Sequence, residues 1–257
     1  MAASCLLFGV VTDIITAIWV YIGRNLPFHI LAYAMFFPTL LSLCFVTDYV
    51  EYFWKIVGTD QLTSTLYYTV LAIPLSVLLV LLCVGIDLLL GWGTRTSFKE
   101  DSLHQHNRTY LSGFLRASGE EVGWRCFMLP CLMSQYSPIV ALTISGIIWG
   151  FFHVPVLILL TNRLRPPKPY ITVLVQCVAC VLAAFPHSWI AIKSGYSFWA
   201  SAMLHAAWNR LNPLLLGSIY TQTPGYIEGE QWLINGEGLA GCLVMLPVAG
   251  LVVWDLS

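Results

Sequence analysis

Long apolar runs dominate this sequence and limit what it can fold into. A run of about 18 or more apolar residues can cross a bilayer as a helix, and the chain holds about eight such runs. Hydrophobic residues make up 58% of the 257 residues and charged residues 10%, against about 25% charged in soluble domains. We therefore predict an all-α fold, a polytopic integral membrane helical bundle of about eight transmembrane helices. It would form one transmembrane domain over residues 1–257, with spans at 4–23, 27–47, 63–91, 109–134, 138–160, 170–192, 197–216 and 238–255.

The basic residues are unevenly divided between the loops of this arrangement. Nine basic residues lie in the loops after the odd-numbered spans, which share one side of the membrane, and the loops on the other side hold only Lys55 and Lys193. Cytoplasmic loops of membrane proteins carry an excess of Lys and Arg, so the loops after the odd-numbered spans are predicted to be cytosolic, with both termini outside. The membrane depends on the host: the plasma membrane in a prokaryote, the endoplasmic reticulum or another endomembrane in a eukaryote. The residues in the odd loops are Arg24, Arg95, Lys99, Arg108, Arg116, Arg163, Arg165, Lys168 and Arg210.

Several short patterns are interpreted as packing features. The eight cysteines lie in or beside apolar runs rather than in polar loops, so we expect no disulfide framework. The pair Cys177-x-x-Cys180 lies inside an apolar run and is likewise assigned to packing. Gly146-x-x-x-Gly150 is the small-residue pattern that lets two membrane helices approach closely. The first apolar run is interpreted as a retained span, because no basic region precedes it.

The stretch GEEVGWRCFMLP, residues 119–130, places three charges inside a predicted span. Each charge at the centre of a membrane helix costs roughly 2.5–3.5 kcal/mol, so these residues need a structural or functional reason. Residues four apart share a helix face, so Glu121 can pair with Arg125, while Glu120 points elsewhere. A structural salt bridge would account for one glutamate and the arginine. It would leave the second carboxylate without a partner, and we therefore favour a functional site.

Two later histidines are the candidate partners of these charges. In WGFFH, residues 149–153, Trp149 and His153 lie one helical turn apart, and in HAAWN, residues 205–209, His205 and Asn209 do the same. The imidazole and the amide of the second pair can both donate hydrogen bonds toward one point, as an oxyanion site requires. Each histidine could instead be structural, for example in a contact between helices.

The remaining polar residues of the apolar runs receive no chemical role. His187 follows a proline in a predicted span, and His104 and His106 lie in a polar loop, each without a partner pattern. Asp13 and Asp87 lie near span ends or could face water. The 12 Lys and Arg residues form no basic face, which argues against binding of nucleic acid.

Taken in order, the motifs Glu-Glu-x-x-x-Arg, aromatic-x-x-x-His and His-x-x-x-Asn resemble those of a known family. This is the CPBP family of intramembrane endopeptidases, which includes the CAAX prenyl proteases and the bacteriocin-processing enzymes and is also called the Abi family. The resemblance covers about residues 110–215, the family-like catalytic core, and GEEVGWRCFMLP and IIWGFFHVP are closest to its prokaryotic motifs. One departure is Trp149, where many members have phenylalanine.

The resemblance implies an intramembrane endopeptidase, a hydrolase that cuts a peptide bond without a cofactor. It implies that Glu120, with His153, activates a water molecule for attack on a peptide carbonyl. His205 and Asn209 would stabilise the resulting oxyanion. The substrate would be a membrane-associated protein or peptide, and the sequence leaves open whether it is a prenylated C-terminus of the CAAX type.

The second glutamate and the arginine have a supporting role in this interpretation. The resemblance implies that Glu121 and Arg125 hold Glu120 in place. A metal alternative uses Glu120, His153 and His205, since one carboxylate and two histidines are a competent zinc set with an open fourth position. We prefer the metal-free interpretation, because the chain has no His-x-x-x-His motif.

Two non-enzymatic interpretations use the same buried charges. A transporter or proton-relay protein would also keep ionisable groups inside the membrane, but broken helix pairs in inverted halves are not evident in the sequence. A scaffold without activity is the other alternative, and the filled motif positions argue against it. In every case the lipid bilayer is the first partner.

Overall fold

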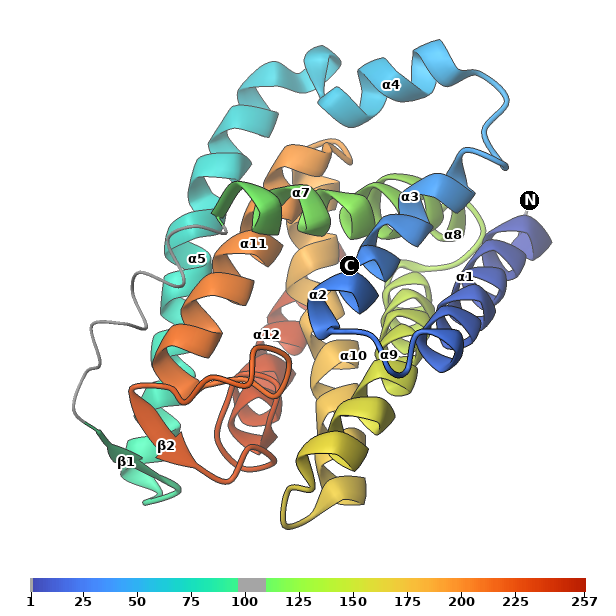
Figure 1. Cartoon of the computed structure of the whole chain (residues 1–257). Helices are drawn as coiled ribbons and strands as arrows, with labels where there is room; N and C mark the ends of the chain where they lie inside the picture. Colours follow the sequence, from blue (N-terminus) through green and yellow to red (C-terminus); the bar gives the residue numbers. More distant parts are fainter. Residues whose placement is uncertain (1, 97–109) are drawn as a thin grey trace.

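The computed structural model describes residues 2–96 and 110–257 and is a bundle of helices (Figure 1). The predicted all-α membrane bundle is confirmed, with one small two-stranded sheet at an end of it. His104 and His106, to which the sequence analysis gives no role, lie outside the described residues. In the first part of the chain the elements are α1 Ala2–Ile22, α2 Phe28–Leu31, the 3₁₀ helix η1 Ala32–Phe36, α3 Phe37–Ser42, α4 Tyr49–Val57, the 3₁₀ helix η2 Thr59–Gln61, α5 Leu62–Leu89 and β1 Gly93–Arg95.

The second part of the chain contributes the helices around which the others pack. Helices α9, α10 and α11 follow one another through short connections and run alternately down and up the bundle (Figure 1). The elements are α7 Tyr110–Glu121, the π-helix η3 Val122–Met128, α8 Leu129–Met133, α9 Pro138–Leu164, α10 Pro169–Lys193, α11 Phe198–Leu216, β2 Ile227–Gly229 and α12 Leu239–Leu256.

Within the described residues, five helical segments are long and apolar enough to cross a membrane. The prediction of about eight spans is therefore not confirmed. The predicted span 27–47 consists of three short helical pieces, 109–134 is divided by a π-helix, and 197–216 is one helix that carries several polar residues. The five segments are Ser4–Ile22, Tyr49–Leu89, Pro138–Leu164, Pro169–Lys193 and Leu239–Leu256.

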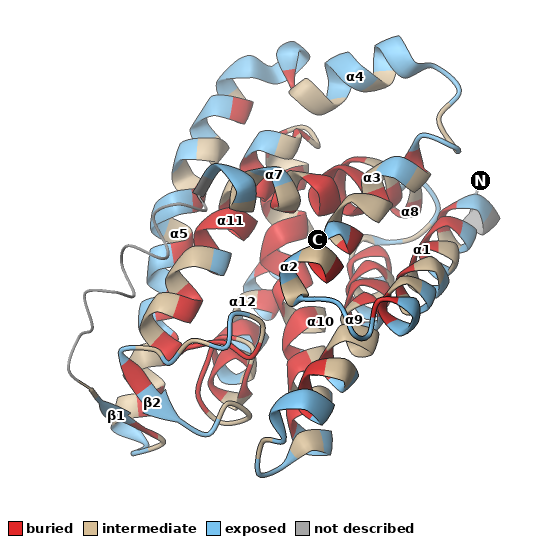
Figure 2. Ribbon diagram, viewed as in Figure 1, coloured by how far each residue is buried: buried red, intermediate tan, exposed pale blue. Residues whose placement is uncertain are grey.

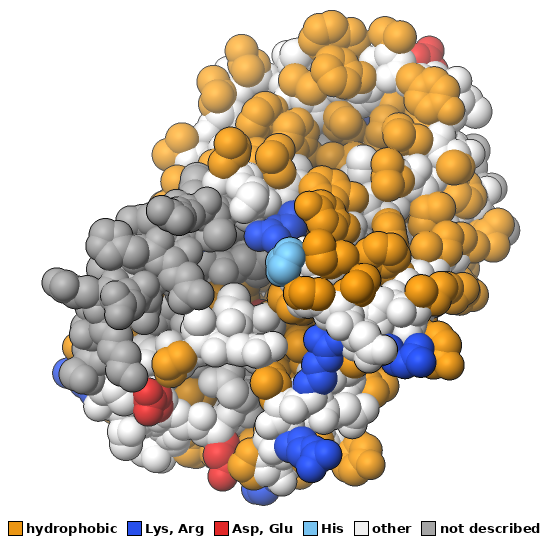
Figure 3. Space-filling view, in the orientation of Figure 1, with side chains coloured by type: hydrophobic (Ala, Val, Ile, Leu, Met, Phe, Trp, Pro, Cys, Tyr) orange, Lys and Arg blue, Asp and Glu red, His pale blue; other side chains and the backbone are white. Residues whose placement is uncertain are grey.

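The outside of the bundle is apolar. Exposed residues follow the outer faces of α1 and α5, whereas the buried residues are concentrated on the inner faces of α9, α10 and α11 (Figure 2). Hydrophobic side chains cover most of the upper part of one face, and charged side chains gather toward its lower end (Figure 3). Such a surface suits hydrocarbon, in which backbone groups must be satisfied within each helix. The surface and the five long helices support an integral membrane protein.

Two glycines seat α7 and η3 against the short helices η1 and α3. A side chain at Gly123 would lie 2.4 Å from the backbone of Pro38, and one at Gly119 would lie 2.8 Å from the carbonyl oxygen of Met35. The hydroxyl of Thr39 donates a hydrogen bond of 2.6 Å to the carbonyl oxygen of Gly119. Because the glycines flank the two glutamates of the motif, this contact fixes the position of both carboxylates.

The predicted glycine pattern in α9 marks a close helix–helix contact. A side chain at Gly146 would lie 2.7 Å from the carbonyl oxygen of Val181 in α10, and one at Gly150 would lie 2.9 Å from the side chain of Val181. The absence of side chains at these two positions lets the backbones of α9 and α10 approach. The contact brings the middle of α9, which carries Trp149 and His153, against α10.

The connection between α11 and α12 folds back over the end of α11. The side chain of Asn212 donates to Asn235 (2.6 Å) and accepts from the backbone N–H of Gly236 (2.8 Å). Asn235 has a left-handed backbone conformation with φ of 92°, which asparagine tolerates better than most residues. Strand β2 in this connection pairs antiparallel with β1, with Gly229 opposite Gly93. The connection is thereby held against the side of the bundle that carries His205.

One prediction about the cysteines is wrong. Cys5 in α1 and Cys131 in α8 form a disulfide, although their positions in or beside apolar runs argue against one. The bond joins residues 126 positions apart, and it lies beside a buried aromatic cluster in which Phe8 contacts Trp124 at a ring separation of 5.5 Å. A sequence in which every cysteine lies near an apolar run gives no spacing signal for such a pair. The free cysteines include Cys177 and Cys180.

Candidate active site

The motif residues lie where α7 changes into a π-helix. Glu120 and Glu121 are the last residues of α7, and Arg125 lies inside η3. A π-helix has wider turns than an α-helix and often occurs at functional sites. The side chains of Glu121 and Arg125 are fully buried, and Glu120 is 2% exposed. Three charges therefore lie together in the interior of the bundle.

Glu121 connects the arginine to the second histidine motif. Its Oε2 lies 3.4 Å from Nε of Arg125, the ion pair that the i, i+4 spacing predicts. Its Oε1 accepts a hydrogen bond of 2.8 Å from Nδ1 of His205 in α11. A carboxylate can only accept at this contact, so Nδ1 of His205 carries a proton. Nε2 of His205 is then the ring atom left to act on a substrate.

Glu120 points in another direction, toward α9. Its Oε2 accepts a hydrogen bond of 2.8 Å from Nε1 of Trp149. The carbonyl oxygen of the same tryptophan accepts a hydrogen bond of 2.7 Å from Nδ1 of His153. Because a carbonyl oxygen cannot donate, the proton of neutral His153 lies on Nδ1, and its Nε2 presents a lone pair. One residue thus holds both the carboxylate and the imidazole that were predicted to work together.

Trp149 makes more contacts in the candidate site than the sequence analysis predicted. Its ring centroid lies 4.2 Å from the guanidinium carbon of Arg125, a cation–π contact. The ring also contacts His153 at 5.3 Å and His205 at 5.8 Å between centroids. A phenylalanine could make these ring contacts, but it could not donate to Glu120. The departure from the family pattern therefore adds a hydrogen bond to the candidate base.

The W149F variant tests this hydrogen bond. A hydrogen bond to a charged group contributes about 1.5–3 kcal/mol, so we expect kcat for peptide cleavage to fall by about tenfold or more. Trp189→Phe is the matched control, because Trp189 also donates to a carboxylate, that of Asp255 (2.8 Å), at the outer surface. The control should keep wild-type kcat. An unchanged kcat in W149F would show that the indole N–H does not position Glu120.

A third histidine reaches the same cluster. His187 in α10 is 3% exposed, and its ring lies 5.3 Å from Trp149 and 5.5 Å from His205 between centroids. Its Nδ1 donates a hydrogen bond of 2.8 Å to the carbonyl oxygen of Ala183. The sequence analysis left this residue without a role because no second polar residue stands at helical spacing from it. Only the packing of α10 against α9 and α11 shows its neighbours.

Three of these side chains could hold a metal ion. One donor atom each from Glu121, His187 and His205 lies within 4.8 Å of the others, the set found among the described residues. This set differs from the predicted alternative, in which Glu120 and His153 joined His205. Arg125 pairs with Glu121 on one side of the set. Its positive charge would repel a metal ion held by the same carboxylate.

Asn209 stands apart from the other predicted site residues. It follows His205 by one turn of α11 and is exposed, and no contact among the described residues joins it to the other five. The loop after α11 adds two residues that no motif predicted. Tyr220 lies 6.5 Å from His153 between ring centroids. Burial raises the pKa of Glu237 to about 7, although the charge of His205 lowers it.

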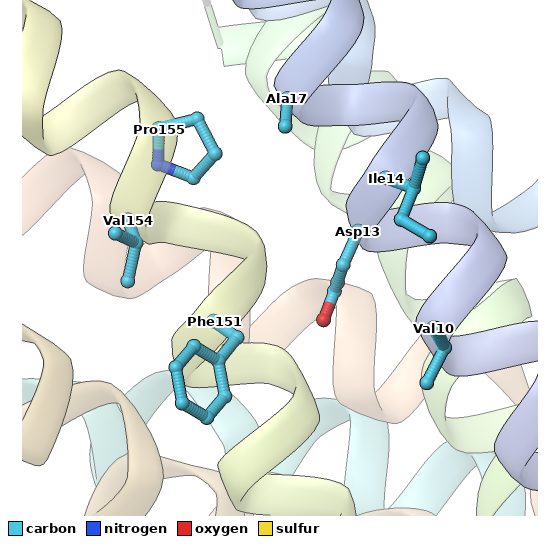
Figure 4. Close-up of a pocket in the computed structure, with 7 residues that line it drawn as sticks. All are labelled: Val10, Asp13, Ile14, Ala17, Phe151, Val154 and Pro155. Atoms are coloured by element: carbon cyan, nitrogen blue, oxygen red, sulfur yellow. The ribbon is translucent and has the colours of Figure 1, made fainter.

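A separate hollow lies on another side of α9. It has a volume of about 330 Å³ between α1 and α9, and six of its seven lining residues are apolar. Asp13 is the polar one and points into the hollow (Figure 4). Phe151, Val154 and Pro155 line its α9 side, whereas His153 contacts Tyr220 and Trp149. The hollow is therefore distinct from the polar cluster.

The all-α fold and the acids, imidazoles and arginine buried among its helices define a class of protein. It is a polytopic membrane protein with a polar site inside the bundle. The comparison with protein families is more specific. Residues 107–211 match the family described as type II CAAX prenyl endopeptidase Rce1-like. The match includes all three motifs, and it confirms the resemblance to the CPBP family of CAAX proteases. No curated protein matches the chain. The match supports an intramembrane endopeptidase of the CAAX type in general terms.

Proposed function

We propose that this protein hydrolyses a peptide bond of a membrane-associated substrate by glutamate catalysis inside the bilayer. The observation that carries the proposal is the joint attachment of Glu120 and His153 to Trp149. Both groups are brought to one place with their acceptor atoms defined, as general base catalysis on a water molecule requires. The family match supports the same reaction class.

The proposed reaction uses the residues in two groups. Glu120 and His153 take a proton from water, and the oxygen of that water attacks the peptide carbonyl. Nε2 of His205, in the doubly protonated ring, and the amide of Asn209 donate hydrogen bonds to the oxygen of the tetrahedral intermediate. The intermediate then breaks its C–N bond, and the proton taken from water passes to the leaving amine. Glu121 orients His205 through the hydrogen bond at Nδ1.

A cleavage assay in liposomes tests this function. The purified chain is incubated with a prenylated CAAX-type peptide and with the same peptide without the lipid. Cleavage that requires the prenyl group would support CAAX processing, and cleavage of both peptides would support a broader substrate range. Absence of any product from either peptide, with the protein folded, would count against the CAAX-type proposal.

The same assay separates glutamate catalysis from zinc catalysis. We expect no loss of cleavage after treatment with a zinc chelator such as phenanthroline, because Glu120 and His153 need no metal to accept a proton. Inactivation that added zinc reverses would refute the metal-free mechanism. It would point instead to the set of Glu121, His187 and His205, whose donor atoms lie within 4.8 Å of one another.

We also propose an orientation in which the basic loops are cytosolic. The last turn of α9 and the connector to α10 expose Arg163, Arg165 and Lys168. Helix α9, about 40 Å long, separates this basic end from the disulfide of Cys5 and Cys131. Basic loops favour the cytosol, and disulfides persist in oxidising compartments. The basic end and the disulfide end of the bundle therefore indicate the same orientation. An epitope inserted after Arg165 should be accessible only from the cytosolic side; accessibility from outside would reverse the orientation.

A further inference from the structure

The site contains one histidine, His187, to which no motif assigns a role. It comes from α10, a helix that carries none of the three motifs, yet its ring lies within 5.5 Å of the rings of both Trp149 and His205. The side chain is 3% exposed, so it is enclosed by the same residues that form the candidate active site.

The hydrogen bond at one nitrogen defines the state of the other. Nδ1 of His187 donates to the carbonyl oxygen of Ala183, so in the neutral ring Nε2 is an acceptor. Nε2 is buried and has no hydrogen-bond partner among the described residues. Leaving a buried acceptor unpaired destabilises the folded state, and phenylalanine would fill the same space without that cost. The imidazole therefore indicates a use for its acceptor atom.

The neighbour that can use this acceptor is His205. One ring nitrogen each of His187 and His205 and a carboxylate oxygen of Glu121 lie within 4.8 Å of one another, a spacing that one water molecule can bridge. His205 already donates from Nδ1 to Glu121. Its Nε2 can donate only if the ring carries a second proton. An acceptor beside each ring nitrogen favours this doubly protonated form.

We propose that His187 is a positioning residue for His205. Its Nε2 accepts from Nε2–H of His205, directly or through one water molecule, and holds the ring of His205 between two acceptors until the substrate arrives. The developing oxyanion then takes over the Nε2–H hydrogen bond. This proposal rests on the proposed function of His205 as an oxyanion donor, and it assigns the part of α10 around His187 to the active site.

The electrostatics of the cluster favour this arrangement over a metal ion. Arg125 stands 3.4 Å from Glu121 and stacks on Trp149, which also contacts His187. A divalent cation between Glu121 and the two histidines would be repelled by that guanidinium in a medium that screens charge weakly. The second proton on His205 adds a single positive charge, which lies against the carboxylate of Glu121, whereas a divalent cation would add two charges beside Arg125.

The test compares two substitutions of His187 in the liposome cleavage assay. H187F keeps the aromatic volume and removes the acceptor, whereas H187Q keeps an acceptor oxygen. Loss of a residue that orients a site ligand typically costs about 10–100-fold, so we expect a fall of that size in kcat for H187F with KM within about twofold. H187Q should recover most of kcat. The exposed His29, changed to phenylalanine, is the control and should behave as wild type.

Several outcomes would overturn the proposal. Wild-type kcat in H187F, or equal losses in H187F and H187Q, would reduce His187 to packing. One equivalent of Co²⁺ or Zn²⁺ bound by the full chain and lost in H187F would make the cluster a metal site instead. If H187F does not fold, H187A replaces it: recovery of kcat with added imidazole is expected, and no recovery refutes the role. Full activity of E120Q would refute the glutamate mechanism and, with it, this role of His187. Loss of cleavage in E120Q together with wild-type kcat in H187F would refute the role of His187 alone.

Discussion

Replacing Glu120 by glutamine is expected to abolish cleavage, with a fall in kcat of about 10²–10⁴-fold. The amide of glutamine has nearly the shape of the carboxylate, and its oxygen can still accept the hydrogen bond from Trp149. It cannot take a proton from water. The measurement is the rate of peptide product formation by E120Q in liposomes, with the melting temperature measured on the same preparation.

The control for E120Q is an acid far from the site. Glu228 in β2 is exposed, and E228Q should cleave at the wild-type rate. Equal melting temperatures of wild type and E120Q would show that the loss concerns chemistry alone. A variant E120Q that hydrolyses the peptide at full rate would remove Glu120 from the mechanism and favour a non-enzymatic role for the buried charges.

Of the single substitutions considered, replacing Arg125 by methionine is expected to cause the largest loss of stability. Methionine fills much of the same volume but leaves the carboxylate of Glu121 buried without the guanidinium that pairs with it. Breaking a buried ion pair by removing one partner costs about 3–5 kcal/mol, and the stacking of the guanidinium on Trp149 is lost as well. For a chain of this size the melting temperature should fall by roughly 6–20 °C, measured in detergent.

Two further variants identify the cause of this loss. Arg95 in β1 is exposed, and R95M should melt within about 2 °C of wild type, because surface substitutions seldom change stability by more than about 0.5 kcal/mol. The double variant E121Q/R125M removes both charges and should recover part of the loss. Equal melting temperatures for R125M and wild type would mean that the pair is not enclosed as the structure has it.

The charged residues of the site could be found from the sequence because they violate a simple rule. A charge inside an apolar run is costly, so Glu120, Glu121 and Arg125 stand out. The i, i+4 spacing predicts the ion pair of Glu121 and Arg125 that the structure shows. Asn209 followed from the same spacing, but the structure places it on an exposed part of α11. Its role as an oxyanion donor stays a prediction.

The rest of the site depends on which helix faces pack together. His187 carries no signal in its own helix, and its neighbours come from α9 and α11. Glu237 lies in a loop whose fold depends on Asn212 and Asn235, a contact that no local pattern predicts. The same limit applies to the bundle: apolar runs predict its class, whereas hydropathy could not show that residues 27–47 divide into three short helical pieces.

The π-helix η3 makes the spacing of the site sensitive to chain length. Seven residues, Val122–Met128, follow the two glutamates in wide turns, and Gly123 in this segment lies against Pro38. Deleting one residue from this segment would return it toward the tighter winding of an α-helix and change the angle around the helix axis between the two glutamates and Arg125. Arg125 would then leave the ring of Trp149 even though every motif residue was still present. The identity of the motif residues and the π-helical winding of η3 are therefore separate requirements. A search for functional variants should preserve both.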